Sequence, residues 1–290
     1  MTPPVALILN PSSSVAETAA ALMAESGIEA KLTVVLPDSD ITEHARDLYQ
    51  SGYRTLIAVG GDGTVRAVAA AILDTDAVLG ILPAGTLNHF ARDLGLPPGL
   101  AACIQVLKTG TARAVDAAEV NGHPFLNNSG LGVYPSMVTR REKRRRFGLH
   151  KWVAFFLACM ATLRRFPFLD VQLAVEGKVF QRRTPFVFIG NNVYRTEPFH
   201  FGTRDFLAGG KLFLAVAQHR IGRLGLLRLA FRALFGRIRT AQDFDIFEVK
   251  EVRIGSRHKR VPVSLDGEVR LIETPLHYRS RPGALRVIAP

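Results

Sequence analysis

The chain has 290 residues, of which 48% are hydrophobic, and its lysines and arginines outnumber its aspartates and glutamates by 37 to 25, a formal net charge of +12. The hydrophobic content excludes a disordered chain, and only two cysteines exclude a small disulfide scaffold and argue against a zinc ribbon or an iron–sulfur cluster. The basic excess indicates an anionic partner: a nucleic acid, a nucleotide or a membrane surface.

The first hundred residues alternate between apolar runs, which predict strands, and segments with helical spacing. The predicted strands are Val5–Leu9, Leu32–Leu36, Thr55–Val59 and Val78–Ile81, and the predicted helices are Val15–Glu25, Ile41–Tyr49 and Val65–Leu73. Alternation with short connections predicts a parallel sheet covered by helices on both faces. The nearly continuous apolar strands agree, because parallel strands are buried on both faces.

From about Ala114 onward, short β-rich runs dominate. The predicted strands are Ala114–Val120, Phe125–Asn128, Leu169–Val175, Pro185–Ile189, Leu212–Gln218, Asp245–Ile254 and Arg260–Leu265. Turn signals such as Asn121-Gly122 suit antiparallel hairpins. Two helical insertions, Pro135–Phe166 and Ile221–Arg239, interrupt the strands, and Ala284–Ile288 is a lone strand that could join either domain.

The sequence therefore predicts two domains. The N-terminal domain is α/β, with a Rossmann-like parallel sheet that binds a nucleotide, and the C-terminal domain is an antiparallel β-sandwich with helical insertions. We place the first domain at residues 1–118, completed by residues 279–290, and the second domain, which would bind the other substrate, at residues 119–278.

The motif Gly60-Gly61-Asp62-Gly63-Thr64 follows the strand Thr55–Val59 and precedes a helix. Such a loop can cradle a phosphate, because glycine lets the backbone approach closely and the helix N-terminus offers free N–H groups and the positive end of its dipole. Thr64 could cap the helix and also donate its hydroxyl to a phosphate. The alternative is a tight turn with Thr64 as a plain N-cap, and the motif is neither a Walker A loop nor GxGxxG.

A second unit of the same kind follows the strand Val78–Ile81 and reads Pro83-Ala84-Gly85-Thr86-Leu87-Asn88-His89-Phe90-Ala91. The carboxyl ends of parallel strands meet at one edge of a sheet, where α/β proteins bind their ligands. Both loops would lie at that edge, and two glycine–threonine helix starts in one place favour a phosphate site over a coincidence of turns.

Together the two motifs resemble the catalytic domain of diacylglycerol kinases, a family that includes soluble bacterial lipid kinases and the sphingosine and ceramide kinases. The resemblance continues at Asn10-Pro11, Asn127, Gly130-Leu131-Gly132, Gly190-Asn191 and Ser264-Leu265-Asp266-Gly267-Glu268, and it spans nearly the whole chain. It implies an ATP-dependent lipid kinase in which the α/β domain and the β-sandwich form a cleft and the α/β domain holds most of the nucleotide.

The resemblance also implies roles for individual residues, with ATP and Mg²⁺ as cofactors. The residues that would bind the nucleotide are Asn10, Gly60, Gly61, Asp62, Gly63, Thr64, Gly85, Thr86 and Asn88. Asp266 and Glu268 would lie across the cleft as the catalytic residues, with Glu268 as the proton acceptor.

The chemistry of phosphoryl transfer agrees with these residue types. It needs positioning, charge neutralisation and an oriented nucleophile, and a carboxylate can take the proton of the attacking hydroxyl. In an extended strand Asp266 and Glu268 would point to the same face, so that one could orient the hydroxyl or bind magnesium while the other acts as base. The alternative from the local sequence is a surface Asp-Gly hairpin turn with two solvated acids.

The chain departs from the family pattern at several positions. The usual Asn-Glu pair after the first loop is replaced by Arg66 and Ala67, and Arg66 could reach a phosphate or be a solvated helix residue. Two further acids of the pattern are replaced by His89 and Gly209, of which the second would help to hold a structural magnesium. These changes leave the metal ligands unassigned, although magnesium bound with ATP is still expected.

Much of the positive charge lies in two segments, Arg140–Lys151 and Arg220–Arg239, next to apolar or aromatic helical stretches. This arrangement suits docking on anionic lipid headgroups, whereas the alternative is a core-packing helix with a solvated basic face. The best candidate for a membrane span, Trp152–Leu163, is far shorter than the ~20 apolar residues required. We expect a cytoplasmic protein bound peripherally to the inner face of a membrane.

Two other functions share some of these features. An enzyme similar to NAD kinase would share the first glycine loop, but the second loop motif and the basic helices suit a lipid substrate better. A non-catalytic protein that binds a nucleotide or a nucleic acid would explain the charge and the missing acids, although no stacking platform, helix-turn-helix or zinc-finger pattern is evident. We predict the lipid kinase and no nucleic-acid partner; the sequence does not identify the lipid or decide whether the protein is a homodimer.

Overall fold

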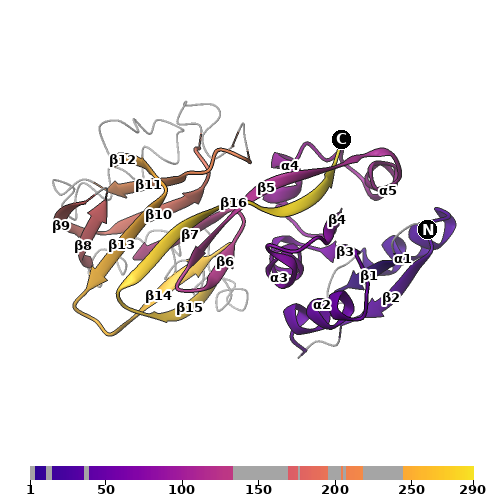
Figure 1. Cartoon of the computed structure of the whole chain (residues 1–290), viewed down its shortest axis with the longest axis horizontal. Coiled ribbons are helices and arrows are strands. Elements are labelled where there is room, and N and C mark those ends of the chain that lie inside the picture. Colours follow the sequence, from indigo (N-terminus) through magenta and orange to yellow (C-terminus); the bar gives the residue numbers. More distant parts are fainter. Residues whose placement is uncertain are drawn as a thin grey trace, which may run out of the picture.

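A computed structural model of the chain describes residues 4–10, 15–35, 39–132, 169–175, 177–194, 204, 207–217 and 244–290. The two kinds of architecture predicted from the sequence lie next to each other along the long axis of the molecule (Figure 1). One is an α/β domain on a parallel sheet, and the other is an antiparallel β-sandwich. The predicted fold class is therefore confirmed.

The α/β domain contains β1 (Val5–Leu9), α1 (Ala16–Glu25), β2 (Ala30–Val34), α2 (Ile41–Gln50), β3 (Thr55–Gly60), α3 (Asp62–Ile72), β4 (Val78–Pro83), α4 (His89–Asp93) and α5 (Leu100–Thr109). Its strands are parallel in the order β2-β1-β3-β4, and the end of β16 (Leu276–Ala289) joins β4 as a fifth parallel strand. The predicted strands and helices of this half all occur, but α3 begins three residues earlier than predicted.

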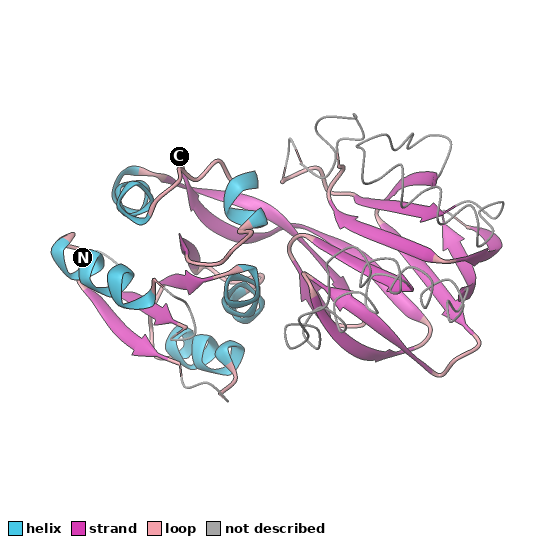
Figure 2. Cartoon of the chain, turned by 180° about the vertical axis from the view of Figure 1, so that it is seen from behind, coloured by secondary structure: helices cyan, strands magenta, loops and turns pink. Residues whose placement is uncertain are grey.

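Helices cover both faces of the parallel sheet (Figure 2) because side chains alternate along each strand. In β1, Ala6 and Ile8 pack in the apolar cluster that contains α2 and α3, whereas Leu7 and Leu9 pack with α1 and α5. The helices that follow β1 and β2 thus lie on opposite faces. In the strand order β2-β1-β3-β4, the chain passes from β1 to β2 on one side and from β3 to β4 on the other. The boundary between β1 and β3 is therefore the switch point, where open α/β sheets bind ligands.

The β-sandwich consists of two sheets. Its strands are β6 (His123–Phe125), β7 (Asn128–Gly132), β8 (Leu169–Val175), β9 (Lys178–Thr184), β10 (Phe186–Asn191), β11 (Leu212–Ala217), β12 (Phe244–Val249), β13 (Glu251–Ser256), β14 (Arg260–Leu265) and β15 (Glu268–Glu273). One sheet has the order β12-β11-β10-β7-β14-β15, and β13, β8 and β9 extend the other from β16. Apolar residues between them form one buried cluster, in which the Tyr278 hydroxyl and Ser129 Oγ are hydrogen-bonded at 3.0 Å.

A long antiparallel ribbon of β5 (Thr111–Val120) and β16 runs through both domains (Figure 1). Near its start β16 pairs with β13 in the sandwich, and near its end it pairs with β4 in the α/β domain. The segment Ala284–Ile288, predicted as a lone strand, is the last part of this 14-residue strand. A register shift between Arg281 and Leu285 marks the passage from one domain to the other.

Two predicted strands are wrong because each is divided in the structure. The predicted strand Phe125–Asn128 is interrupted after Phe125, where backbone N–H groups bind a side chain instead of a neighbouring strand. The predicted strand Asp245–Ile254 bends at Lys250, so that β12 and β13 belong to different sheets. Val249 and Val252 are both buried in the same core but are three residues apart, so the alternation of buried and exposed residues shifts by one position at the bend.

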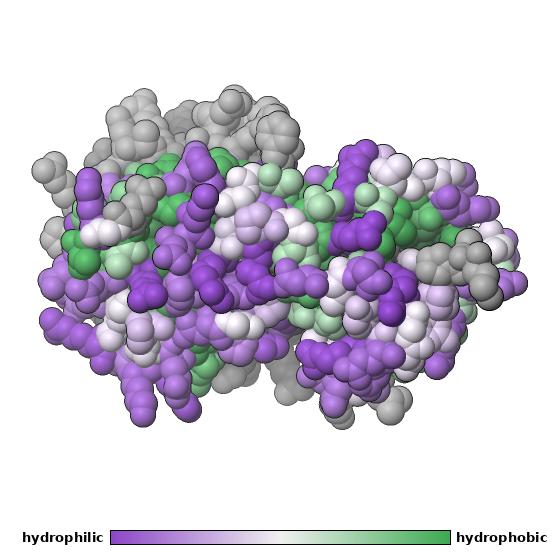
Figure 3. Space-filling model, in the orientation of Figure 1, coloured by the Kyte–Doolittle hydropathy of each residue, from purple (hydrophilic) through white to green (hydrophobic). Residues whose placement is uncertain are grey.

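The two predicted helical insertions, and with them the basic segments Arg140–Lys151 and Arg220–Arg239, lie outside the described residues. In the parts of the chain that the structure describes, no helix has the length and apolar character needed to span a bilayer. The face of the molecule in Figure 3 is largely hydrophilic over these parts, with hydrophobic residues in smaller groups between them.

Four charged side chains join the ribbon to the end of α3. Glu119 on β5 is 4% exposed and accepts hydrogen bonds from Arg279 and Arg281 of β16, and Arg281 also pairs with Asp74. Burial opposes ionisation of Glu119, but the two arginines outweigh it and hold the pKa of this carboxyl below its usual value. The ion pairs thus stabilise the ribbon where the domains meet.

We expect Glu119→Gln to lower the free energy of unfolding by about 1–3 kcal/mol at pH 7, because charge-assisted hydrogen bonds are lost. Because the pKa is lowered in the folded state, this stabilisation exists above the unfolded value of about 4.3 and is lost as the pH falls below it. In urea denaturation, the difference in the free energy of unfolding between the wild type and Glu119→Gln should therefore be smaller at pH 3 than at pH 7. Glu273→Gln, in an exposed pair with Arg260, is the control and should change stability by less than about 1 kcal/mol; equal effects of the two substitutions would contradict the assignment.

Candidate functional site

The carboxyl ends of β1, β3 and β4 gather the predicted nucleotide-binding residues at one edge of the parallel sheet. Gly60 and Pro83 are paired at the ends of β3 and β4, and Ala84 N donates to Gly60 O at 2.9 Å. The loops that follow touch each other: a Cβ on Gly85 would lie 2.5 Å from Gly61 Cα. This approach of backbone to backbone leaves no room for a side chain at Gly85, and a Cβ on Gly61 would lie 3.3 Å from Gly85 Cα, which is a tight contact.

Thr64 lies in the first turn of α3, but it is not the N-cap that the sequence suggested. The helix begins at Asp62, with Gly61 as its N-cap, and Val65 N donates to Gly61 O at 3.1 Å. The Thr64 side chain is 4% exposed, and its hydroxyl accepts a hydrogen bond from Asn10 Nδ2 at 3.1 Å. Thr64 thus joins α3 to the end of β1, and the backbone N–H groups of the first turn of α3 have no acceptor within the helix itself.

Asn88 closes the second loop. Its backbone is left-handed, with φ of 47°, and its side chain accepts from Gly85 N at 3.0 Å and donates to Gly85 O at 2.8 Å. Thr86 and Leu87, between these two residues, are exposed at the edge of the sheet. The hydrogen bonds fix the loop, and its exposed tip can approach a ligand.

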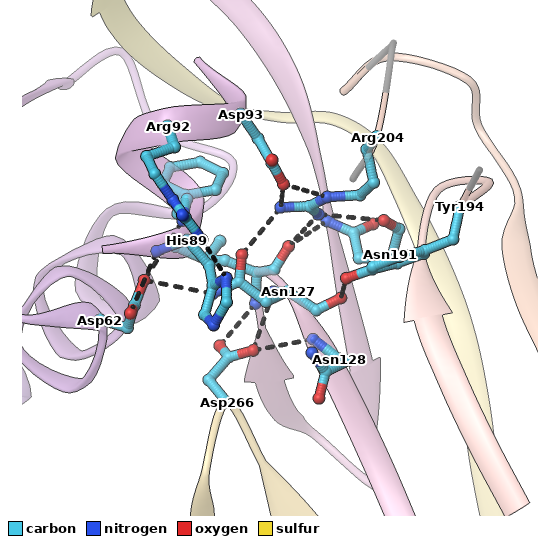
Figure 4. Close-up of polar contacts among 12 residues, drawn as sticks. Asp62, His89, Arg92, Asp93, Asn127, Asn128, Asn191, Tyr194, Arg204 and Asp266 are labelled. Atoms are coloured by element: carbon cyan, nitrogen blue, oxygen red, sulfur yellow. Dashed lines mark hydrogen bonds and ion pairs between the residues drawn. The ribbon is translucent and has the colours of Figure 1, made fainter. Parts of the chain in front are cut away.

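Asp62 connects the two loops and the sandwich (Figure 4). Its carboxylate accepts from His89 N and Phe90 N, both at 3.2 Å, at the start of α4. Asn127 Nδ2 donates to the same carboxylate at 3.4 Å from the sandwich side. The Asp62 carboxylate therefore caps α4, and it accepts three N–H donors from two segments of the chain.

Arg204 is at the centre of a buried network between α4 and the sandwich (Figure 4). The residue is 5% exposed, and its guanidinium binds Asp93 at 2.7 Å. It also donates to Leu126 O at 2.7 Å, Asn191 O at 3.0 Å and Asn127 Oδ1 at 2.8 Å. The family resemblance includes the two asparagines, but no local sequence pattern marks Arg204 or Asp93 as part of a network.

Asp266 does not lie on an extended strand with Glu268, so the prediction that both acids share a face is wrong. Asp266 and Gly267 have φ of 47° and 90° and form the turn between β14 and β15. The Asp266 carboxylate turns inward and accepts from Leu126 N and Asn127 N at 2.8 Å and from Asn128 N at 2.9 Å (Figure 4). Burial raises the pKa of this carboxyl, and the three N–H groups oppose the rise.

Glu268 is the predicted acid that reaches the glycine loops. It is the first residue of β15, its side chain is 47% exposed, and its Oε1 would lie 3.0 Å from a Cβ on Gly63. Its Oε2 pairs with Arg66 of α3 and lies 3.9 Å from Arg270. Arg66 itself is 6% exposed, so the expectation of a solvated helix residue is wrong: the first turns of α3 face the sandwich.

The described residues do not include a group of three or more His, Cys, Asp or Glu side chains placed to hold a metal ion. Around Gly209, backbone and side-chain groups bind one another: Gly209 N donates to Asn192 Oδ1 at 2.8 Å and Gly210 N donates to Asp116 Oδ2 at 2.6 Å. The surroundings of Gly209 are thus held together by hydrogen bonds within the protein.

Replacing Asp266 with alanine would leave three backbone N–H groups without their acceptor, and a buried donor left unpaired costs about 1–3 kcal/mol. We expect Asp266→Ala to lower the free energy of unfolding by at least about 2 kcal/mol, measured by urea denaturation. The free energy of unfolding of Asp266→Asn should lie between those of the wild type and Asp266→Ala, because asparagine keeps one acceptor oxygen. The exposed Asp47→Ala should change stability by less than about 0.5 kcal/mol, and an unchanged midpoint for Asp266→Ala would refute the structural role of this carboxylate.

Two family models and several known proteins match the chain. The diacylglycerol kinase catalytic domain matches residues 4–120, and the YegS C-terminal NAD kinase beta sandwich-like domain matches residues 131–289. Diacylglycerol kinase of Bacillus subtilis is 26% identical over 247 residues, which are 84% of this chain and 80% of that protein. A Pseudomonas aeruginosa protein named "Probable lipid kinase YegS-like" is 43% identical over 123 residues, which are 42% of this chain and 40% of that protein.

The crystal structure of a diacylglycerol kinase from Bacillus anthracis has the same fold, with a TM-score of 0.72 at 21% identity over 99% of this chain and 97% of that chain. Three of the curated relatives are matched over less than two thirds of their own length, at 64%, 40% and 40%. The C-terminal model alone covers more than half of the chain. The chain belongs to the family of proteins that join a diacylglycerol kinase catalytic domain to a YegS-type C-terminal β-sandwich domain.

Proposed function

We propose that this protein is an ATP-dependent lipid kinase that transfers the γ-phosphate to a lipid hydroxyl. The observation that carries the proposal is the approach of Glu268 to Gly63, because it brings a carboxylate of the sandwich to the first turn of the helix behind the glycine loop. A phosphate cradle with a proton acceptor beside it is the arrangement that phosphoryl transfer to an alcohol requires. Relatives named as lipid and diacylglycerol kinases support the same reading.

ATP would bind along the two glycine loops. The residues that would hold it are Asn10, Gly60, Gly61, Asp62, Gly63, Thr64, Gly85, Thr86 and Asn88. The fit rests on two features of the loops: side chains are absent where the backbones meet at Gly61 and Gly85, and the first turn of α3 offers N–H groups and a positive dipole end. Magnesium bound with the nucleotide would neutralise charge on the phosphates.

Glu268 would take the proton of the attacking lipid hydroxyl. The hydroxyl oxygen then forms the new bond to the γ-phosphorus, the bond between that phosphorus and ADP breaks, and the proton moves to the carboxylate. The half-exposed Glu268 can meet a substrate, whereas the Asp266 carboxylate, occupied by three backbone N–H groups, holds the turn that carries Glu268. We therefore assign the proton acceptor to Glu268 and a supporting role to Asp266.

The test is transfer of label from ATP to lipid in vesicles that contain diacylglycerol, ceramide, a sphingoid base or phosphatidylglycerol. We expect labelled phospholipid in the organic phase with at least one of these lipids. NAD belongs in the same panel, because the C-terminal family model is described as NAD kinase-like. Label in NAD alone would favour that second function, and no transfer to any acceptor would leave a nucleotide-binding protein without kinase activity.

Glu268→Gln should reduce kcat by about 10²–10⁴-fold, because glutamine cannot accept the proton. Its dissociation constant for ATP should stay close to that of the wild type, since the carboxylate is not needed for binding. Glu273→Gln, on the same strand and exposed, is the matched control and should keep its activity. Turnover retained by Glu268→Gln would rule out Glu268 as the base.

We also propose that the basic segments Arg140–Lys151 and Arg220–Arg239 bind an anionic membrane surface, which would bring the site to its lipid. Each basic residue near such a surface contributes about 1 kcal/mol, and 1 M salt reduces the screening length to about 3 Å. Sedimentation with vesicles should therefore show release at high salt, and Arg144→Glu with Arg145→Glu should weaken binding at least about tenfold.

The control for this experiment is Arg257→Glu with Lys259→Glu, two exposed basic residues outside both segments, and it should have a smaller effect. Binding that resists salt would show that apolar insertion, rather than charge, holds the protein on the vesicle. Equal losses in the two double variants would show that net charge matters and the segments do not.

A further inference from the structure

Arg66 is a buried cation of the α/β domain with a partner in the sandwich. It lies one turn into α3, is 6% exposed and donates to Glu268 Oε2 at the start of β15. Its Nε is buried and has no hydrogen-bond partner among the described residues. A guanidinium removed from water needs a nearby anion, and the Glu268 carboxylate is the anion that Arg66 contacts directly.

The two oxygens of the Glu268 carboxylate have different surroundings. Oε2 binds Arg66 on its buried side and lies 3.9 Å from Arg270 on its exposed side. Oε1 lies toward Gly63 and, within the described part of the chain, accepts no hydrogen bond. The oxygen that faces the first turn of α3 is therefore the one that is open to a proton from a substrate.

We propose that Arg66 is a positioning residue, which fixes Oε2 of Glu268 so that Oε1 faces the substrate hydroxyl beside the glycine loop. The inference rests on the proposed kinase function and extends it to a residue outside the predicted site. Without Arg66 the Glu268 side chain, which is half-exposed, could turn among several rotamers. A proton acceptor displaced by about 1 Å can lose on the order of 10²-fold in rate.

A direct contact between Arg66 and the phosphates is the competing role. The burial of the side chain and its bond to Glu268 argue against it, because the guanidinium would have to leave both to reach a ligand at the edge of the sheet. The two roles differ in kinetics. A positioning residue acts on kcat, whereas a phosphate contact present in the ground state also lowers KM for ATP.

The experiment compares Arg66→Met and Arg66→Lys with the wild type, and the control Arg270→Gln removes the second positive charge near the same carboxylate. Methionine suits the buried site, because replacing one member of a buried ion pair by an apolar residue leaves only the half-exposed Glu268 unpaired. We expect Arg66→Met to lower kcat about 10–100-fold with little change in KM for ATP. Arg66→Lys should recover part of the loss, and Arg270→Gln should lower kcat by less than about fivefold.

A double-mutant cycle with Arg66→Met and Glu268→Gln, measured by urea denaturation, tests the contact itself without any activity. If the residues are in contact, the double variant should be less destabilised than the sum of the single variants. Additive effects in this cycle would overturn the inference, and so would wild-type kcat in a folded Arg66→Met protein. A rise in KM for ATP with unchanged kcat would show that Arg66 binds the phosphates instead of positioning Glu268. A wild-type protein that transfers no phosphate is a separate result, seen before any variant is made, and it would remove the proposed function together with the role built on it.

Discussion

The antiparallel ribbon of β5 and β16 is the constraint on which the rest of the structure depends. One continuous strand pairs with β13 in the sandwich and with β4 in the α/β domain, so the two cores are joined by backbone hydrogen bonds and not only by side-chain contacts. The edge of the parallel sheet is thereby held next to the turn between β14 and β15. Without this ribbon, neither the glycine loops nor Glu268 would form a site.

Two buried arginines lie between the domains, and they differ in how fully their hydrogen bonds are satisfied. Arg204 binds a carboxylate, an amide oxygen and two backbone carbonyls, which is nearly all that a guanidinium can bind. Arg66 binds one oxygen of a half-exposed carboxylate, and its Nε has no hydrogen-bond partner in the part of the chain that the structure describes. A saturated network rigidifies a structure, whereas a buried polar group without a partner calls for a separate explanation, which the proposed positioning role of Arg66 supplies.

The parts of the site that sequence could predict are those in which neighbouring residues decide the structure. A strand, a glycine loop and a helix follow one another within about ten residues, so the loops at Gly60 and Gly85 could be read directly. The surroundings of Asp266 could not, because its three donors come from residues 138 to 140 positions away. The burial of Arg66 could not be predicted for a similar reason, because its partner Glu268 lies 202 positions away and only the neighbouring hairpin covers this charged residue of α3.

The hairpin turn explains how two acids separated by one glycine can have different roles. In an extended strand, residues at positions i and i+2 share a face, and Asp266 and Glu268 would compete for the same surroundings. The left-handed turn at Asp266 and Gly267 instead points one carboxylate into the backbone of Leu126–Asn128 and leaves the other at the edge of β15. The first carboxylate fixes the turn, and the turn fixes the second carboxylate opposite the glycine loop. Conformation, rather than residue type, therefore separates the acid that holds the turn from the half-exposed acid that we propose as the proton acceptor.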